Sequence, residues 1–461
     1  MHFNLLFILI FSTLGAQTYY HSSIGINYPT YNARSFAIGS AHADNSALCL
    51  SSMPSNLSMG ENQLFSIVYS YLGHSNLERR SIVVKDSFDD YLTEADYVRN
   101  INYNQSSAIA IKYNKDIGKI KFSAGFSYLP FKTYNYNYKE EIRGSLPSND
   151  GDIFSRDPFL GNHILESEGS QHLYSIGSSI DLILNKDLKM SIGLSSNIIN
   201  NTTINESMVV DMLSMDDDIS GYFSDIIPYE IEYNLKGDNF FTFGYRLQFH
   251  KYAFGLSFEQ SGVIKNNLND FTYEYLESIE IFENSEGVLD TTYNIISYDI
   301  LYSDNQVIKN YINDYLELKT SDIQKPKKYG LSMAIMNHSK NDISFILSYE
   351  KYEYDKSYVL SSNEKYSMGI EHYTLNNTAL RFGFEYQTSP FKPYISSTSS
   401  FTFGLGYKVK KLIFDIGGSY SQIQYSFPDL YPVTDNLFQD LDSVNESNLI
   451  LLGSLTYKFY L

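Results

Sequence analysis

The stretch that decides the fold is FFTFGYRLQFHKYAFGLSFEQ, residues Phe240–Gln260. Large apolar side chains occupy every second position on both sides of the pair His250-Lys251. This apolar set is Phe241, Phe243, Tyr245, Leu247, Phe249, Tyr252, Phe254, Leu256 and Phe258. Alternation with a period of two predicts two β-strands, and the two residues between them predict a tight hairpin turn.

The polar face of this hairpin favours a closed barrel over a soluble β-sandwich. A sandwich covers its outer faces with long polar side chains. Here the alternate positions carry mainly small residues with a few charges. Small residues suit the interior of a barrel, where space is limited, while an aromatic face suits lipid. The 42 Tyr and 30 Phe of this low-hydropathy chain fit the same interpretation.

The same hairpin pattern recurs along the chain, between a first strand near 65–71 and a last strand at the C-terminus. The six hairpins lie at about 109–128, 174–194, 241–258, 329–349, 366–386 and 401–420. Fourteen strands result, an even number as a bacterial single-chain barrel requires. The sequence therefore predicts an all-β fold, a 14-stranded antiparallel transmembrane β-barrel.

Short and long connections alternate strictly between these strands. The short turns are 114–118, 185–188, 250–251, 337–342, 375–378 and 409–411. The long connections are about 73–105, 131–170, 200–238, 261–326, 354–363, 389–398 and 426–447. Short periplasmic turns opposite long extracellular loops are typical of the bacterial outer membrane, and they place both termini on the periplasmic side.

The chain ends in a strand pattern, NLILLGSLTYKFYL, whose apolar stripe runs to Leu461. This strand is predicted to close the barrel against the first strand. It also carries the kind of terminal signal that barrel-assembly machinery reads. Because Leu461 replaces the usual terminal aromatic residue, that signal depends on Tyr457 and Phe459.

The N-terminal part divides into two predicted segments before the barrel of residues 62–461. Residues 1–16 have the short apolar core and small residues of a signal peptide. Residues 17–61 are available to fill a lumen that fourteen strands leave too wide for their own side chains. The single cysteine, Cys49, excludes an internal disulfide and suits a small buried side chain. The net charge of −19 argues against nucleic acid as a partner.

Residues 17–61 contain a motif that resembles the N-terminal hatch of the FadL-type outer-membrane transport family, including its PorV-like relatives. In that family Arg-x4-Gly-x-Ala precedes an acidic residue, Ser-Ala and an Asn-Pro-Ala-x-Leu element. The matching residues here are Arg34, Gly39, Ala41, Asp44, Ser46, Ala47, Pro54 and Leu57. The last element reads Met53-Pro54-Ser55-Asn56-Leu57, so its spacing is altered and Met53 replaces Asn.

The resemblance implies passive uptake of hydrophobic small molecules, such as long-chain fatty acids or hydrocarbons. They would be captured outside and released laterally through the wall or past the hatch. One alternative is a hatch that only plugs and braces the barrel. Others are a PorV-like component of a protein secretion system and a structural or surface-binding barrel.

Two wall features are predicted to serve this function. Pro130 lacks an N–H for the strand ladder, so the wall should be interrupted near the outer end of strand three, while Gly125 leaves space beside the hatch. In its simpler interpretation Pro130 only ends the strand.

If the hairpin at 366–386 is in register, Glu371 and Arg381 face each other in the lumen.

Residues with catalytic chemistry are scarce in this sequence. It shows no nucleophile and base at informative spacing, no phosphate-binding loop and no metal-ligand motif, so we expect no enzyme activity, cofactor or bound metal. A barrel phospholipase or protease is the alternative, since its residues would lie far apart in sequence. The acidic run Asp216–Asp218 lies in a predicted outer loop. It could bind calcium, or bind lipopolysaccharide through bridging divalent cations, or simply face solvent.

Overall fold

Fourteen strands pair in one closed antiparallel ring, which confirms the predicted barrel. Their order is β1-β2-β3-β6-β7-β10-β11-β16-β17-β18-β19-β20-β21-β22, and β22 pairs with β1 to close the ring. This computed structural model describes residues 19–460 except 40, 61–63, 89, 144–158, 186, 213–225, 284, 286, 288, 298–304, 337–342, 356–358, 375–376, 392–393 and 432–440. The predicted signal peptide and Asp216–Asp218 lie outside the described residues.

The barrel strands are as follows. They are β1 (Leu64–Lys85), β2 (Tyr91–Ile117), β3 (Ile120–Thr133), β6 (Ser170–Ile183), β7 (Leu188–Ile199), β10 (Asn239–Phe249), β11 (Tyr252–Glu259), β16 (Lys327–Ile335), β17 (Ile343–Glu353), β18 (Asn363–Tyr373), β19 (Thr378–Gln387), β20 (Thr398–Val409), β21 (Leu412–Phe427) and β22 (Asp442–Tyr460).

Alternation along each strand separates an outer apolar face from an inner polar face. In β10, Phe241 and Phe243 are 55% and 41% exposed on the outer face, whereas Thr242 between them is fully buried. Phe249 pairs with Tyr252 across the tight turn, and His250 takes a left-handed φ of 50° there. At the closing seam, Phe65 pairs with Phe459, so the last strand does complete the wall.

Several connections predicted as long loops are strands instead. The predicted loop 73–105 is wrong, because β1 and β2 pair from Leu64↔Asn114 out to Lys85↔Tyr91. Within 131–326 the chain forms a second, six-stranded sheet in the order β15-β12-β9-β8-β5-β4. Its strands are β4 (Tyr136–Arg143), β5 (Phe159–Glu168), β8 (Thr202–Met212), β9 (Ile226–Lys236), β12 (Gly262–Asn266) and β15 (Ile323–Lys325). Most of them directly continue a barrel strand, so the wall extends beyond the barrel.

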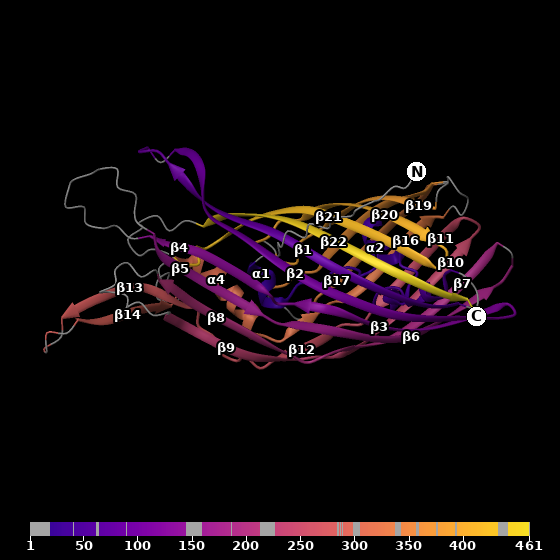
Figure 1. The fold of residues 1–461 in the computed structure, drawn as a ribbon, viewed down its shortest axis with the longest axis horizontal. Helices are drawn as coiled ribbons and strands as arrows, with labels where there is room; N and C mark the ends of the chain where they lie inside the picture. The colour runs from indigo at the N-terminus through magenta and orange to yellow at the C-terminus, as the bar shows by residue number, and fades with distance from the viewer. Residues whose placement is uncertain are drawn as a thin grey trace, which may run out of the picture.

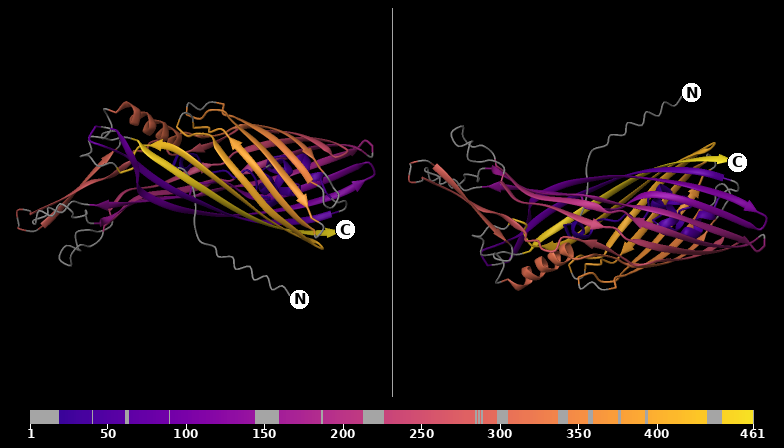
Figure 2. Two further views of the ribbon diagram at one scale, coloured as in Figure 1. Left: turned by 90° about the horizontal axis from the view of Figure 1, so that it is seen from above. Right: turned by 90° about the horizontal axis from the view of Figure 1, so that it is seen from below.

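The extension lies at the end of the molecule opposite the C-terminus (Figures 1 and 2). There β13 (Glu274–Glu283) and β14 (Leu289–Ser297) form a projecting hairpin, and α4 (Gln306–Thr320) packs beside the sheet. Asn305 caps α4 by accepting from two backbone N–H groups. A buried ion pair between Lys319 and Glu206 ties the helix to β8.

The lumen is filled by residues 19–60, here called the luminal segment. Its elements are α1 (Tyr19–Ile24), α2 (Ala33–Ile38), η1 (Ala41–Ala43), η2 (Ala47–Ser51) and η3 (Pro54–Ser58). Figure 2 shows this segment enclosed by the barrel strands in both views. Cys49 is free and fully buried within it. Among the described residues, no helix is long and apolar enough to cross a membrane.

Candidate functional site

Local caps shape the turns of the luminal segment. Asn32 caps the start of α2, and Gly39 ends the helix with a φ of 75°, a left-handed conformation that favours glycine. The Oγ of Ser46 caps η2 by accepting from the N–H of Leu48 at 3.2 Å. Pro54 occupies the first turn of η3, where its missing N–H costs nothing. Several motif residues therefore have a structural task in the segment.

Inward-facing glycines let the backbone of the segment lie directly against the wall. A Cβ added at Gly193 would lie 2.3 Å from the carbonyl carbon of Pro54. One added at Gly369 would lie 2.1 Å from the carbonyl oxygen of Ile38. Both distances are far below a van der Waals contact, so even alanine would displace the segment or the strand.

Arg34 joins the luminal segment to a charge network on the wall. Its Nε and Nη2 donate to the two oxygens of Glu371 at 2.8 and 2.6 Å, and its Nη1 donates to the carbonyl of Ala43 at 2.9 Å. Glu371 and Arg381 lie opposite each other in β18 and β19, in the predicted register, and Arg381 Nε donates to Glu371 Oε1 at 2.8 Å. Arg381 Nη1 also donates to Asp415 at 2.6 Å. Two arginines and two carboxylates thus alternate in this network. Arg34 belongs to the luminal segment, and the other three belong to the wall.

Asp44 is buried in the same segment, with 1% of its surface exposed. Its Oδ1 accepts from the N–H and the Oγ of Ser46, both at 2.8 Å. Among the described residues, its Oδ2 has no hydrogen-bond partner. Burial raises the pKa of Asp44 to about 6, although the bonds from Ser46 and nearby cations oppose the shift. This carboxyl therefore weakens the packing of the segment once it ionises.

The other predicted residues fall in two places. Ala47 and Leu57 pack on Gly125 of β3, because a Cβ added there would lie 3.1 Å from Ala47 and 3.0 Å from Leu57. Gly125 thus lies beside the segment, and side chains of the segment occupy the space that it leaves. Ala41 is the first residue of η1. Pro130 lies further along β3.

The wall is interrupted where β2 and β3 separate. The two strands stop pairing at Ile109↔Tyr128, although both continue beyond it. In β3 the register shifts between Pro130 and Lys132, so the strand does not end at Pro130 but bulges there.

A cavity of about 220 Å³ lies at this interruption. It is lined by Tyr28 and Tyr31 of the luminal segment and by Ser107 and Pro130 of the wall. Ser107 lies on the outer face of β2, in alternation with inward Ala108. The cavity therefore has lining groups from both faces of the wall.

A larger cavity, of about 370 Å³, lies on the side of the long connections. Leu129, Phe131, Leu173 and Phe240 supply apolar lining. The charged lining consists of four lysines and two carboxylates, namely Lys132, Lys325, Lys328, Lys365, Glu259 and Glu385. It shares Ile26, Tyr28, Tyr31 and Lys132 with the cavity at the wall interruption. We call it the upper cavity.

The sequence analysis missed these lysines and the anchoring lysine Lys112. Lys112 Nζ donates to the carbonyls of Asn45 and Met59, both at 2.7 Å, and so holds the C-terminal part of the segment. The available signal was a charged residue at an inward position of a strand. An inward position predicts that a side chain lies in the lumen, but it does not predict which group the side chain contacts.

No family model matches this chain, and no curated protein matches its sequence. Solved structures do match it. A Pseudomonas aeruginosa FadL homologue is 11% identical, with a TM-score of 0.52 over 95% of this chain and 99% of that one. A variant of the TodX monoaromatic hydrocarbon channel is also 11% identical, with a TM-score of 0.50 over 94% of this chain and 100% of that one. The chain therefore has the fold of the FadL-type hydrophobic-compound channels.

Proposed function

We propose that this protein is a channel of the bacterial outer membrane for passive uptake of hydrophobic small molecules, such as long-chain fatty acids or hydrocarbons. The observation that carries the proposal is the junction of two cavities. The upper cavity combines apolar and charged lining, and its apolar residues Leu129 and Phe131 belong to β3, where β2 and β3 separate. A molecule in the upper cavity therefore has a short path to the outer face of the wall.

The luminal segment makes this lateral path the favoured one. It occupies the lumen below the upper cavity, and at the wall glycines Gly193 and Gly369 its backbone lies directly against the strands. A hydrophobic molecule gains free energy by leaving along apolar surface into lipid rather than through water. Residues 17–61 then act as a hatch that closes the direct route.

The orientation follows from the same proposal. The upper cavity and the six-stranded extension face the outside, where lipopolysaccharide surrounds them. The short turns and the C-terminal strand lie on the periplasmic side, from which barrel-assembly machinery would insert the chain. Residues 1–16 serve as the export signal, and residues 62–461 form the barrel.

The test is uptake of labelled oleic acid and toluene by cells that carry the protein or lack it. Ser107→Phe places a large ring at the mouth of the wall cavity without touching the luminal segment. Ile109→Phe is the matched control, because Ile109 lies on the same outer face but within the paired ladder. We expect uptake with the wild type and with Ile109→Phe, and loss of uptake with Ser107→Phe.

A combined Arg34→Ala and Asp44→Ala variant tests the hatch separately. If this double variant changes uptake and Ser107→Phe does not, the route passes the hatch rather than the wall. If the wild type takes up no more than cells lacking the protein, transport is the wrong class.

The second candidate is a component of a protein secretion system. The projecting β13–β14 hairpin and the open six-stranded sheet favour it, since together they offer a broad surface at one end of the barrel (Figure 1). Deletion of residues 274–297 would then abolish display of an exported protein and leave uptake of oleic acid unchanged.

A further inference from the structure

Two more cavities lie on the other side of the luminal segment, toward the short turns. Their volumes are about 260 and 270 Å³, and both are lined by Arg34, Asn45, Met59, Gly60 and Tyr373. We call the two together the lower chamber. It is separate from the upper cavity, with which its described lining shares no residue.

The lower chamber is basic in a strongly acidic chain. Its described lining contains six cationic side chains and two carboxylates. The cations are Arg34, Lys112, Arg246, Arg381, Lys408 and Lys458, and the carboxylates are Glu371 and Asp415. The whole chain carries a net charge of −19. The sign of the local charge is thus reversed at this place, which attracts anions.

Arg246 is the arginine of the chamber that forms no ion pair among the described residues. It lies on the inner face of β10 and is only 7% exposed. Its guanidinium donates to Gln248 Oε1 at 2.8 Å and contacts the sulfur of Met336 at 3.8 Å. Among the described residues it forms no ion pair. The Asp181 carboxylate attracts it from beyond ion-pair distance, and the Oδ1 of that carboxylate accepts from Ser58 Oγ.

This arrangement is costly unless something else pairs with the guanidinium. Taking a charge out of water is unfavourable when no opposite charge compensates it. Arg381, the comparable arginine of this chamber, meets that cost with Glu371 and Asp415. Arg246 makes no such contact with a carboxylate, and only the more distant Asp181 offsets its charge, so the site can accept a further negative charge.

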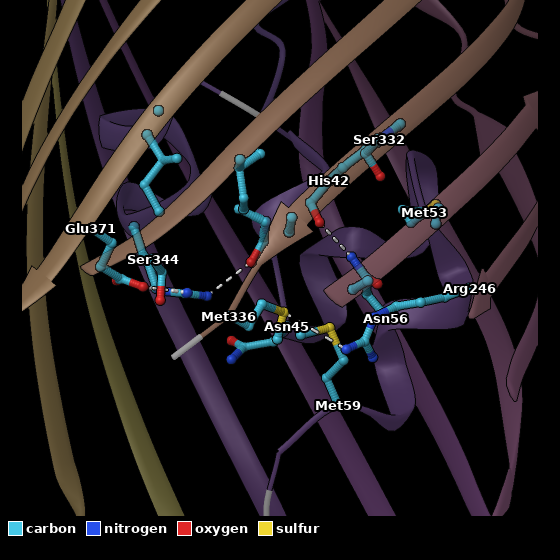
Figure 3. Close-up of a pocket in the computed structure, with 18 of the residues that line it drawn as sticks. His42, Asn45, Met53, Asn56, Met59, Arg246, Ser332, Met336, Ser344 and Glu371 are labelled. Carbon is cyan, nitrogen blue, oxygen red and sulfur yellow. Dashed lines mark hydrogen bonds and ion pairs between the residues drawn. The ribbon is translucent and has the colours of Figure 1, made fainter. Parts of the chain in front are cut away.

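The surroundings of Arg246 are apolar and adaptable. Figure 3 shows its guanidinium directed toward Met59 and Met336, and Met53 of the luminal segment lines the same cavity. Ala253, Ala334 and Ile346 complete this side of the cavity. Thioether side chains adapt to varied apolar shapes. The pocket thus pairs one fixed cation with an apolar lining, as small-molecule sites commonly do.

We propose that the lower chamber holds a second binding site, for an amphipathic organic carboxylate. The carboxylate pairs with the Arg246 guanidinium, which can donate two parallel N–H bonds, and the apolar part lies among Met53, Met336 and Ala334. The site deepens the proposed function and rests on it, because a molecule taken up into the upper cavity reaches the lower chamber only when it passes the hatch instead of leaving through the wall. It assigns anionic amphiphiles, rather than neutral hydrocarbons, to the side of the hatch that faces the short turns.

The test is calorimetric titration of the purified full-length mature protein in nonionic detergent micelles. Octanoate is the probe, and octan-1-ol is its uncharged match. We expect Arg246→Gln to weaken octanoate binding at least about tenfold, as loss of a charge-assisted bond does, and to leave octanol binding unchanged. Arg246→Lys keeps the charge and should restore most of the affinity.

Three further variants locate the site. Arg79→Gln, at an exposed arginine paired with Asp96, should bind octanoate as the wild type does. Lys132→Gln removes a cation of the upper cavity, so a change in this variant reports octanoate bound there rather than in the lower chamber. Ala334→Phe fills the pocket and should weaken both ligands. Each variant is first checked for the heat-modifiable migration of a folded barrel.

Two results would overturn the site: equal octanoate affinity in Arg246→Gln and wild type, or loss of affinity in Lys132→Gln alone. An equal loss for octanol in Arg246→Gln would also overturn it, since the effect would not concern charge. Failure of the proposed function looks different. In that case octanoate binds and depends on Arg246, but cells carrying the protein take up no more of it than cells lacking the protein.

Discussion

Replacement of Arg34 by Gln should loosen the luminal segment from the barrel wall. Arg34 makes two charge-assisted bonds to Glu371 and one bond to the Ala43 carbonyl. Removing one partner of a buried ion pair costs about 3–5 kcal/mol. The lower end applies here, because the Arg34 side chain is 20% exposed and Glu371 keeps Arg381 as a partner. We therefore expect a loss of about 3 kcal/mol in the free energy of docking.

The native Cys49 provides the assay. It is the single cysteine of the chain, and its thiol is fully buried in the docked segment. A maleimide can react only when the segment opens, so the labelling rate follows the open fraction when opening and closing are fast. A loss of about 3 kcal/mol corresponds to an increase of roughly 100-fold in that rate.

The matched control is Arg79→Gln. Arg79 pairs with Asp96 at 3.5 Å, but both side chains are about half exposed. Exposed pairs contribute about 0–1 kcal/mol, so the labelling rate should stay near that of the wild type. Labelling of Arg34→Gln at the wild-type rate, with the barrel still folded, would refute the network as an anchor.

Three other outcomes are expected. Gly193→Ala should raise Cys49 labelling about tenfold or more, because its Cβ would collide with the backbone at Pro54, whereas Gly453→Ala meets open space and should change nothing. Burial raises the pKa of Asp44 to about 6, so the docked segment binds this proton more tightly than the free one. Docking should be strongest below about pH 4 and should weaken as the pH rises to about 6. The rate of Cys49 labelling, corrected for thiol ionisation, should then rise on the order of 100-fold. If Asp44→Asn showed the same pH profile as the wild type, this reasoning would be contradicted. In a Cys49→Ser background, an impermeant maleimide on intact cells should label Gln306→Cys but not Lys251→Cys, and the reverse pattern would invert the barrel.

The barrel could be predicted from the sequence because its signal is local. In β10 the large apolar residues from Phe241 to Phe249 face outward and the residues between them face inward, although Phe240 is buried. Alternation together with the tight turn therefore fixes strand, face and register. The same rule placed Glu371 opposite Arg381. It failed beyond the membrane, where β1 and β2 continue through 73–105 with charged residues on both faces. Without a lipid-facing stripe, such strands resemble loops in sequence.

The contacts of the luminal segment were less accessible to sequence reasoning. The motif identified Arg34 and Asp44, but Arg34 bonds to a residue 337 positions away in the chain. Such a pairing depends on how the segment lies in the lumen, which no local pattern encodes. Arg246 shows the same limit, since its inward position was evident from alternation while its lack of an ion pair among the described residues depends on the whole lumen.

Two parts of the luminal segment are held by different kinds of interaction. At α2, Arg34 is fixed by a carboxylate that a second arginine also binds. Nearer Gly125, Lys112 donates to backbone carbonyls, and Asp44 carries a buried carboxyl that opposes docking when ionised. Bonds to neutral carbonyls contribute less than those between ions. We therefore infer that the segment opens first at η2 and η3, beside Gly125, on the same strand that carries the wall interruption at Pro130. A hatch hinged at α2 would widen the lateral path before it opened the direct one.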